Sequence, residues 1–309
     1  MKKDLISLRD LNKKEIIFLF KKTKELKKVF KKKKFLNLLK GRIGVLLFEK
    51  PSLRTRVTFE TALKQLGGES IYLSPSDVQM GKRESVKDIA QNLSRWIDLI
   101  IVRTFSHNIT KELKEYSIVP VINALDDYEH PCQALADYYT IWEREKNLEK
   151  IKLGFIGDGN NVCHSLMLGA KILGVNMMVA TPKGYEPAQE ITEFSKEKVI
   201  LTNDPREVVK ECDYIYTDVW VSMGQESEKE KRIKDFQGFQ VNSELLKLAK
   251  KDYKIMHCLP AHRGEEITDE VLDSENSIVL DQAENRLHIQ RTLILYLLNL
   301  IKLSSSIKK

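Results

Sequence analysis

The sequence predicts an α/β protein with two domains, each of which is a parallel sheet flanked by helices. Its length of 309 residues exceeds the roughly 100–200 residues of one average domain. Short, continuously apolar segments alternate with amphipathic helical segments, a pattern typical of strands that helices cover on both faces. The charged segment 143–150, EREKNLEK, interrupts that alternation. We therefore expect a first domain over residues 1–146 and a second over residues 147–288.

Composition excludes several classes of protein. Hydrophobic residues make up 42% and charged residues 31% of the chain, as in globular rather than disordered proteins. The longest apolar segment, Leu293–Ile301, is interrupted by Asn299 and is far shorter than the roughly 20 residues of a membrane span. The four cysteines lack paired spacing, and the basic N-terminus lacks the apolar core of a secretory signal. We expect a cytoplasmic protein with no disulfide framework and no membrane partner.

The first series of strands and helices begins near residue 42. Its expected strands are the apolar runs IGVLLF (43–48), ESIYLS (69–74), LIIVR (99–103) and VPVINAL (119–125). After the first of them, Phe59, Ala62, Leu63 and Leu66 recur at helical spacing, and Gly67-Gly68 ends that helix. Further helices are expected over 86–97, 108–116 and 135–142.

The second series restarts after the charged segment. Its expected strands lie within IKLGFIG (151–157), NMMVAT (176–181), KVILT (198–202), YIYTDVW (214–220) and KIMHCLPA (254–261). A last amphipathic helix, Ile289–Leu303, lies beyond this series. We expect it to pack back on the first domain, so that residues 289–309 belong there.

Most of the positive charge has a structural explanation. The formal net charge is +7, and lysines are concentrated between Lys21 and Lys40. Apolar residues recur at helical spacing through the same segment, which places the lysines on the outer face of an amphipathic helix. Aromatic residues of a nucleic-acid-binding motif are not interleaved with them, so no nucleic-acid partner is expected.

The first candidate site follows the first strand, in FEKPSLRTR (48–56). Ser52, Arg54, Thr55 and Arg56 lie where this strand gives way to a helix, and a helix start offers unpaired N–H groups and the positive end of its dipole. Two hydroxyls and the guanidinium groups complete an oxyanion site, most simply a phosphate site. The alternative is a helix cap with surface arginines, but a cap needs only one such residue.

Two other strand ends of the first domain carry polar residues. Arg103 closes the strand 99–103, and the tetrapeptide HPCQ (130–133) follows the strand 119–125. Pro131 suits a first helical turn, so His130 and Gln133 would project from a helix start. Because ligands of open parallel sheets bind beyond the carboxyl ends of the strands, we expect these side chains to reach the same anion.

The segment IGDGNNV (156–162) only partly matches a dinucleotide-binding fingerprint. Gly157 and Gly159 fit, but Val162 occupies the third glycine position. The next strand ends in Thr181, where a ribose-binding acid is expected. A nicotinamide-dependent oxidoreductase is therefore a minor alternative. Asn160 and Asn161 instead suit a polar or carboxylate-bearing ligand.

Two later strand ends suggest an amino-acid site. In DVWVSMG (218–224), the carboxylate of Asp218 can bind an ammonium group, and the Ser222 hydroxyl can bind a carboxylate. In HCLP (257–260), Cys258 could act as a nucleophile with His257, or hold a metal with His257 and His262. One cysteine with two nearby histidines is a weak metal pattern, and neighbours on a strand point to opposite faces. We expect no metal.

Together these motifs resemble the carbamoyltransferase family, and most closely its ornithine-using members. The resemblance extends in order and spacing over nearly the whole chain. It rests on the family's Ser-Thr-Arg-Thr-Arg, His-Pro-Cys-Gln, Asp-x-x-x-Ser-Met-Gly and His-Cys-Leu-Pro motifs. The sequence departs from them at Leu53, which replaces the first threonine and removes one hydroxyl while keeping the backbone N–H. The Ser-Met-Gly loop is the most specific motif, because it separates ornithine-using from aspartate-using members.

The resemblance implies a carbamoyl-phosphate domain followed by an ornithine domain, and it assigns the site residues. Residues that match the carbamoyl-phosphate site are Ser52, Leu53, Arg54, Thr55, Gln79, Arg103, His130, Pro131, Cys132, Gln133, Cys258, Leu259 and Arg286. Residues that match the ornithine site are Asn161, Asp218, Ser222 and Met223. The catalytic assignments are Arg54, Arg103, His130 and Cys258. Gln79 matches a position that reaches the phosphate site across a subunit contact.

The implied reaction transfers the carbamoyl group of carbamoyl phosphate to the δ-amine of L-ornithine, giving L-citrulline and phosphate in arginine metabolism. No cofactor is expected, and a homotrimer or a multiple of it is implied. Arg54 would stabilise the leaving phosphate, and Arg103 and His130 would polarise the carbamoyl oxygen. Asp218 and Cys258 would orient the amine. Transfer to another amine such as putrescine is the main alternative, and a non-catalytic nucleic-acid-binding protein is a third. The sequence suits arginine synthesis and arginine breakdown equally.

Overall fold

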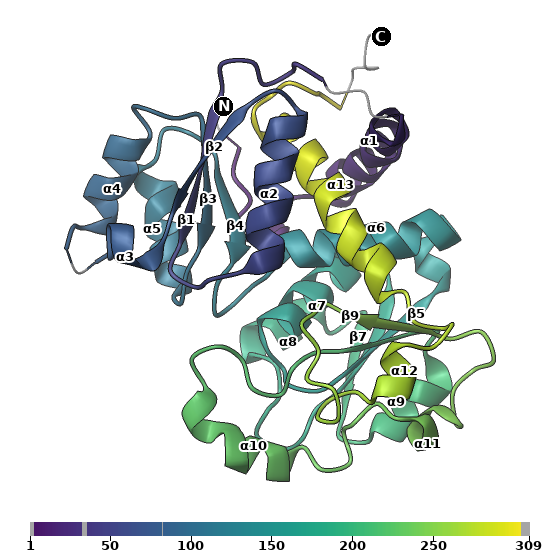
Figure 1. Cartoon of the computed structure of the whole chain (residues 1–309). Helices are drawn as coiled ribbons and strands as arrows, with labels where there is room; N and C mark the ends of the chain where they lie inside the picture. The colour runs from purple at the N-terminus through teal and green to yellow at the C-terminus, as the bar shows by residue number, and fades with distance from the viewer. Residues whose placement is uncertain (1–2, 33–35, 82, 304–309) are drawn as a thin grey trace. The chain divides into compact units, whose positions relative to one another are not determined.

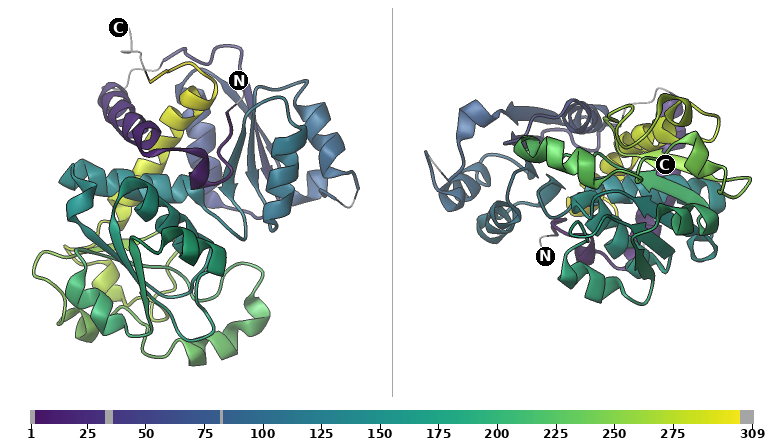
Figure 2. Two further views of the ribbon diagram at one scale, coloured as in Figure 1. Left: turned by 180° about the vertical axis from the view of Figure 1, so that it is seen from behind. Right: turned by 90° about the horizontal axis from the view of Figure 1, so that it is seen from below.

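The computed structural model describes residues 3–32, 36–81 and 83–303. Within the lysine-rich segment, Lys33, Lys34 and Phe35 lie outside the described residues. The chain divides into two compact units, one of Met1–Leu135 with Asn285–Lys309 and one of Ala136–Glu284. Each unit contains one parallel sheet with helices against it (Figures 1 and 2), which confirms the predicted fold class.

The first unit is built on a four-stranded parallel sheet in the order β2-β1-β3-β4. The strands are β1 (Ile43–Phe48), β2 (Glu69–Leu73), β3 (Leu99–Arg103) and β4 (Val121–Leu125). Helices α4 (Val86–Leu93) and α5 (His107–Tyr116) lie on one face of the sheet, and α2 (Leu53–Gln65) lies on the other (Figure 1). Because all four strands are parallel, their carboxyl ends meet at one edge, where the candidate phosphate residues begin.

The lysine-rich helix is amphipathic, as expected. It is α1 (Lys13–Lys31), and it buries Ile16, Leu19, Phe20 and Leu26. Most of its lysines are exposed or half-buried, but Lys22 is buried and pairs with Glu25 at 2.8 Å. The outer-face assignment therefore holds for the helix, with Lys22 as the exception.

The C-terminal helix packs on the first unit, as predicted, but its expected limits were wrong. It is α13 (Val279–Leu297) rather than 289–303. Thr23 on α1 donates to Thr292 on α13 at 2.8 Å, and the Arg291 guanidinium lies 3.9 Å from the centre of the Phe30 ring. The helix ends early because Asn299 adopts a left-handed conformation, with a φ of 58°. It begins early because a buried polar segment, which breaks the apolar periodicity, is also helical.

The second unit is built on a five-stranded parallel sheet in the order β7-β6-β5-β8-β9. The strands are β5 (Lys152–Ile156), β6 (Asn176–Ala180), β7 (Val199–Thr202), β8 (Tyr214–Thr217) and β9 (Lys254–His257). Its helices are α6 (Pro131–Glu145, mostly in this unit), α7 (Asn161–Leu173), α8 (Gln189–Ser195), α9 (Pro205–Glu211), α10 (Lys229–Asp235), α11 (Ser243–Leu246) and α12 (Asp269–Leu272). The short α3 (Pro75–Val78) belongs to the first unit.

Close packing in the second unit depends on glycine in β5. A Cβ atom at Gly154 would lie 2.4 Å from Val208 Cγ1 and 3.0 Å from Cys212 Sγ, so a larger residue would push α9 from the sheet. The residues that surround this contact form the core of the unit, with Ile156, Ile215 and Ile255 among them.

The domain boundaries inferred from the sequence remain a prediction. Contacts within the chain group most of α6 with the second unit, where Tyr138 Oη donates to the backbone oxygen of Leu166 at 2.5 Å and Tyr214 Oη donates to Glu145 at 2.8 Å. No described helix is both long enough and apolar enough to cross a membrane.

Candidate active site

The turn from β1 into α2 forms the start of the phosphate half-site. Ser52 caps α2, and its hydroxyl accepts from the Thr55 backbone N–H at 3.3 Å and donates to Thr55 Oγ1 at 3.0 Å. Arg54 is half-buried, whereas Leu53 is 75% exposed. Arg56 turns away to Glu60, at 2.9 Å, and to the ring of Tyr72. Ser52 can therefore cap α2 while the same turn binds an anion. One hydroxyl accepts from only one of the unpaired N–H groups at the helix start, and the others can donate to a ligand.

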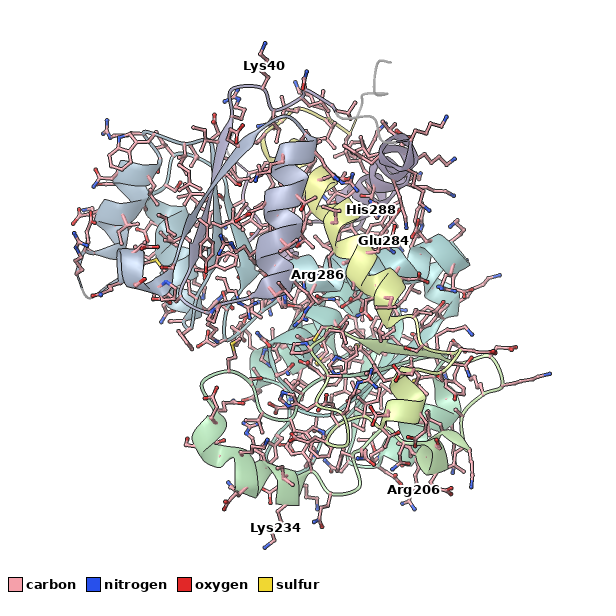
Figure 3. The ribbon with its side chains drawn as sticks, in the orientation of Figure 1. Lys40, Arg206, Lys234, Glu284, Arg286 and His288 are labelled. Carbon is pink, nitrogen blue, oxygen red and sulfur yellow. The ribbon has the colours of Figure 1, made fainter. Side chains whose placement is uncertain are left out.

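Buried cations of the first unit surround this turn. Arg286 on α13 (Figure 3) donates to Thr55 Oγ1 at 2.8 Å and is almost fully buried. Arg103 is also buried at the end of β3. Lys50, which the sequence analysis did not single out, is buried two residues before Ser52. Burial, and then the charge of Arg103, lower the pKa of Lys50, although Asp127, Asp126 and Glu49 act in the opposite direction. The three buried cations together make the region electropositive, as an anion site requires.

His130 lies in the same electropositive region. Burial, and then the charges of Arg286 and Arg103, hold the pKa of His130 well below its ordinary value of 6.5. The imidazole is therefore neutral near pH 7. A neutral imidazole can donate a hydrogen bond to a carbonyl oxygen and leaves the positive charge to the neighbouring arginines.

The remaining residues of the HPCQ segment have structural surroundings. Pro131 is the first residue of α6, as expected, and Gln133 is buried. The Cys132 thiol donates to the backbone oxygen of Asn123 at 3.4 Å, and burial raises the pKa of this thiol to about 12. Cys132 is therefore a neutral packing residue and not a thiolate.

A buried polar network supports the loop that carries His130. Asp126 accepts from Asn123 Nδ2 at 2.8 Å and pairs with His107 Nδ1 at 2.7 Å, and it also accepts the Glu129 backbone N–H at 2.8 Å. Glu129 in turn accepts from the Leu8 backbone N–H at 3.1 Å, and burial raises its pKa to about 7. Sequence patterns gave no signal for this network, because its members come from three separate segments of the chain.

Gln79 stands apart from the other predicted phosphate residues. It is exposed, directly follows the short helix α3, and has a left-handed backbone with a φ of 50°. Within the described residues, no hydrogen bond joins its side chain to the β1–α2 turn. Its assignment therefore depends on the family resemblance alone.

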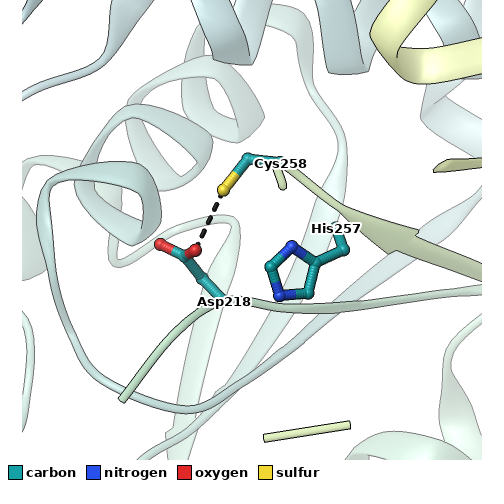
Figure 4. Close-up of side chains that lie close together, drawn as sticks. All are labelled: Asp218, His257 and Cys258. Carbon is teal, nitrogen blue, oxygen red and sulfur yellow. Dashed lines mark hydrogen bonds between the residues drawn. The ribbon is translucent and has the colours of Figure 1, made fainter. Parts of the chain in front are cut away.

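The amino-acid half-site is centred on Asp218, which follows β8 in the second unit. Its two carboxylate oxygens are held separately. Cys258 Sγ donates to Oδ1 at 2.9 Å (Figure 4), and Asn160 Nδ2 donates to Oδ2 at 2.9 Å. Asp218 is buried, whereas Cys258 is half-buried. The structure thus brings Asp218 and Cys258 together, as the role of orienting an amine requires.

His257 is not a partner for a Cys258 nucleophile. Its Nδ1 accepts the Leu259 backbone N–H at 2.8 Å, so Nε2 carries the proton and donates to Glu266 at 3.1 Å. The imidazole takes no part in the hydrogen bond between Cys258 and Asp218 (Figure 4). Leu259 has a left-handed backbone with a φ of 58°.

Two groups of side chains have the donor types of a metal site. The ligand atoms of Asp218, His257 and Cys258 lie within 4.8 Å of one another, as do those of His262, Glu265 and Glu266. In the first group, both ring nitrogens of His257 already make hydrogen bonds. Metal binding there would require one of these bonds to break.

The other predicted ornithine residues occupy two loops of the second unit. Asn160 caps α7 by accepting from the backbone N–H groups of Val162 and Cys163, so Asn161 becomes the first helical residue. In the loop after β8, the Ser222 backbone N–H donates to Gln225 at 3.1 Å, and Met223 is exposed. Asn160 therefore has a structural role, whereas the Asn161 and Ser222 side chains remain candidates for ligand contact.

Asp158 and Arg232 form a buried ion pair that the sequence analysis missed. Arg232 Nη1 donates to Asp158 Oδ2 at 2.9 Å. Burial raises the pKa of Asp158 to about 6 even though Arg232 acts in the opposite direction. No local pattern connects these residues, because Arg232 lies on α10, far along the chain from the turn that contains Asp158.

Comparisons with known proteins identify the family of the chain. The model described as "Aspartate/ornithine carbamoyltransferase, carbamoyl-P binding domain" matches residues 3–143, and the one described as "Aspartate/ornithine carbamoyltransferase, Asp/Orn binding domain" matches residues 149–297. The chain is 48% identical to an ornithine carbamoyltransferase of Pyrococcus horikoshii, with 97% of each chain covered. It is 49% identical to one of Methanosarcina mazei, with 96% of this chain and 100% of the relative covered.

Solved structures give the same result. The structure of ornithine carbamoyltransferase from Pyrococcus furiosus has a TM-score of 0.93 and 48% identity, and the match covers 97% of this chain and 98% of that one. The enzyme of Thermus thermophilus has a TM-score of 0.88 and 43% identity, with 96% and 99% covered. The likeness therefore includes both sequence and fold over nearly the full length.

Proposed function

Since the chain belongs to the aspartate/ornithine carbamoyltransferase family, we propose that it transfers the carbamoyl group of carbamoyl phosphate to the δ-amine of L-ornithine. The products are L-citrulline and phosphate. The observation that carries the choice of acceptor is the buried Asp218, held by Cys258 and Asn160 at the start of the loop that contains Ser222 and Met223. A buried carboxylate favours an ammonium group, as an amino-acid acceptor with a side-chain amine requires.

The donor phosphate is bound by the β1–α2 turn and its cations. Arg54 and the N–H groups at the start of α2 stabilise the dianion, with Ser52, Leu53 and Thr55 contributing hydroxyl or backbone groups. Arg286 is held against Thr55 and adds a second guanidinium. These contacts strengthen as negative charge develops on the leaving phosphate, so they accelerate the reaction as well as bind the substrate.

The carbamoyl group is polarised by Arg103 and the neutral His130. Both would donate to the carbamoyl oxygen, on which charge develops when the amine attacks the carbon. Gln133 would hold the carbamoyl amide, and the Pro131–Cys132 segment would support that geometry. The low pKa of His130 suits this role, because a neutral donor does not add another buried charge beside two arginines.

The acceptor is held by Asp218, Asn161, Ser222 and Met223. Asp218 and Cys258 orient the δ-amine, which must lose a proton before its nitrogen bonds to the carbamoyl carbon. The bond from that carbon to the phosphate oxygen then breaks. Phosphate leaves with the electron pair and takes up the second proton of the attacking nitrogen. Catalysis by alignment and electrostatic stabilisation needs neither a covalent enzyme intermediate nor a cofactor.

The assembly and location are part of the same proposal. A homotrimer or a multiple of it would allow Gln79 to reach the phosphate site of a neighbouring subunit, as the family resemblance implies. Its exposed position on the first unit is compatible with that role. The four cysteines, all of which are among the described residues, form no disulfide with one another, which supports a reducing, cytoplasmic location.

An acceptor panel tests the proposal. Purified protein is given carbamoyl phosphate with L-ornithine, putrescine or L-aspartate, and the carbamoylated product and phosphate are both measured. We expect equimolar citrulline and phosphate with ornithine, and at least 100-fold lower kcat/KM with the other two acceptors. If carbamoylputrescine were the main product, the acceptor would be a simple diamine and not ornithine. Phosphate release without any carbamoylated product would contradict carbamoyl transfer.

A further inference from the structure

Arg232 is a buried cation on α10 that makes contacts with two separate loops. Its side chain is only 8% exposed, whereas Lys234 on the same helix points away into solvent (Figure 3). Arg232 Nη1 donates both to Asp158 Oδ2 and to the backbone oxygen of Trp220, each at 2.9 Å. Its Nε donates to Glu228 Oε2 at 3.0 Å. One guanidinium thus connects the turn after β5 with the loop after β8.

Both contacts lie beside residues of the amino-acid half-site. Asp158 is two residues before Asn160, whose side chain holds Asp218 at 2.9 Å. Trp220 lies midway between Asp218 and Ser222 in the sequence. The two loops are therefore joined at two points, by Asn160 to Asp218 and by Arg232 to Asp158 and Trp220. These contacts hold Asp218 and Trp220 against the turn after β5, and Ser222 follows Trp220 by two residues.

Aromatic packing reinforces the same connection. The Trp220 ring stacks on Phe236, at the end of α10, with ring centres 5.5 Å apart and planes at 29°. The Tyr185 ring contacts Phe236 edge-on at 4.8 Å, and the Arg232 guanidinium lies 5.0 Å from the Tyr185 ring centre. Trp220 and Phe236 are both buried. Helix α10 therefore holds the loop after β8 through a charged contact and an apolar contact.

Lysine cannot reproduce this geometry. The planar guanidinium offers several N–H groups in fixed directions, whereas an ammonium group is a compact charge on a flexible chain. Replacement by lysine keeps a positive charge near Asp158 but loses at least one of the directed contacts to Trp220 and Glu228. Replacement by a neutral residue would also leave Asp158 buried without its cation, which is destabilising.

We propose that Arg232 is a positioning residue for acceptor binding, which sets the affinity for the amino acid by fixing the 218–224 loop against the 157–161 turn. This inference rests on the proposed function for the identity of the acceptor. Arg232 makes no contact with the reacting atoms in this account. Its loss should raise the KM for ornithine, while the donor half-site in the other unit stays intact.

The test compares Arg232→Lys with Arg206→Lys. Arg206 is an exposed arginine of the same unit (Figure 3), and it pairs with Asp204 at 2.7 Å, so it controls for the chemical change alone. We expect the KM for ornithine to rise at least tenfold in Arg232→Lys, with kcat and the KM for carbamoyl phosphate changed less than threefold. Arg206→Lys should change none of them. An unchanged KM for ornithine, or a fall in kcat alone, would overturn the inference.

A second variant keeps the inference testable if Arg232→Lys folds poorly. Asp158→Asn keeps the shape of the side chain and leaves the contact between Arg232 and Trp220 in place, so it should raise the KM for ornithine by a smaller factor. The double variant should be no worse than Arg232→Lys alone, because both changes disrupt one connection. If the increases in the KM for ornithine of the two single variants multiplied in the double variant, Arg232 and Asp158 would have independent roles. That result would overturn the inference.

Hydrogen exchange of residues 219–224 separates this inference from the proposed function. Without substrate, exchange should be faster in Arg232→Lys than in the wild type and unchanged in Arg206→Lys. Faster exchange with an unaltered KM for ornithine would contradict the positioning role. A wild-type protein that forms no citrulline would instead overturn the proposed function.

Discussion

At the scale of single residues, the candidate site is built on buried cations in the first unit and on a buried carboxylate in the second. Arg103, Arg286 and Lys50 are buried in the first unit, and Asp218 is buried in the second. Burying charge is costly unless a partner or a ligand compensates for it. Buried cations suit a phosphate dianion, and a buried carboxylate suits an amine.

The phosphate role of Arg54 can be measured directly. Arg54→Ala should lower kcat/KM for carbamoyl phosphate by roughly 100-fold or more, about 3 kcal/mol, because a charge-assisted contact to the leaving group is lost. Arg42→Ala is the matched control, since Arg42 is an exposed residue at the opposite end of β1 that pairs with Asp98. Equal activity of the two variants would remove Arg54 from the mechanism.

The neutral state of His130 gives a second residue-scale prediction. Burial and two neighbouring arginines lower its pKa, so its ring should remain neutral from pH 8 down to pH 6. Nitrogen-15 NMR of the histidine side chains reports this state, with His130 assigned by its absence from His130→Asn. Protonation of His130 above pH 6 would exclude its role as a neutral donor.

At the scale of elements, the turns after the parallel strands carry the candidate site residues, and close packing of the strands and helices holds those turns in place. The sequence predicted all nine strands found in the described residues, because continuous apolar runs bounded by polar turns are distinctive. It misplaced α13, because that helix carries Gln282, Asn285 and Arg286 on buried positions and so lacks an apolar stripe there. Buried polar residues near a functional site interrupt the apolar periodicity from which a helix is predicted.

Packing at Gly154 tests this dependence at the level of β5 and α9. Gly154→Ala should destabilise the protein by roughly 1–3 kcal/mol, because the added methyl group would lie 2.4 Å from Val208 Cγ1. Combining Gly154→Ala with Val208→Ala should recover part of the lost stability, because the smaller side chain at residue 208 leaves room for the added methyl group. Unfolding in urea measures both variants. If Gly154→Ala alone were as stable as the wild type, the packing argument would fail.

At the scale of the whole molecule, each unit supplies one half of the proposed chemistry from its own sheet. Strand-end motifs predicted Ser52, Arg103, His130 and Asp218, because short polar motifs after apolar runs are visible in a sequence. Lys50, Glu129, Asp158 and Arg232 were missed. The roles of the last three depend on contacts between segments far apart in the chain, such as Arg232 with Asp158, and no local pattern encodes such contacts.

Two buried carboxyl groups also make the stability of the molecule depend on pH. Glu129 has a pKa of about 7 in the folded protein, against an ordinary value of 4.5, so the folded state binds its proton more tightly. Stability should therefore fall as the pH rises from about 4.5 to 7, by up to about 3 kcal/mol from this group. Asp158, with a pKa of about 6, acts in the same direction.

Glu129→Gln should reduce that dependence, because the amide has no proton to lose. Urea unfolding at pH 5, 6 and 7.5 would show a smaller fall for Glu129→Gln than for the wild type. Glu193→Gln, at an exposed position on α8, should show the same fall in the free energy of unfolding with rising pH as the wild type. A parallel pH dependence in wild type and Glu129→Gln would exclude Glu129 as its source.

The central claim is that a buried carboxylate in the second unit binds the amine that accepts the carbamoyl group. Steady-state citrulline formation by Asp218→Asn, with ornithine varied at saturating carbamoyl phosphate, tests it most directly, with the exposed Asp252→Asn as control. We predict a fall in kcat/KM for ornithine of roughly 100-fold or more, with the KM for carbamoyl phosphate within threefold of the wild type. A kcat/KM for ornithine equal to that of the control would contradict the account.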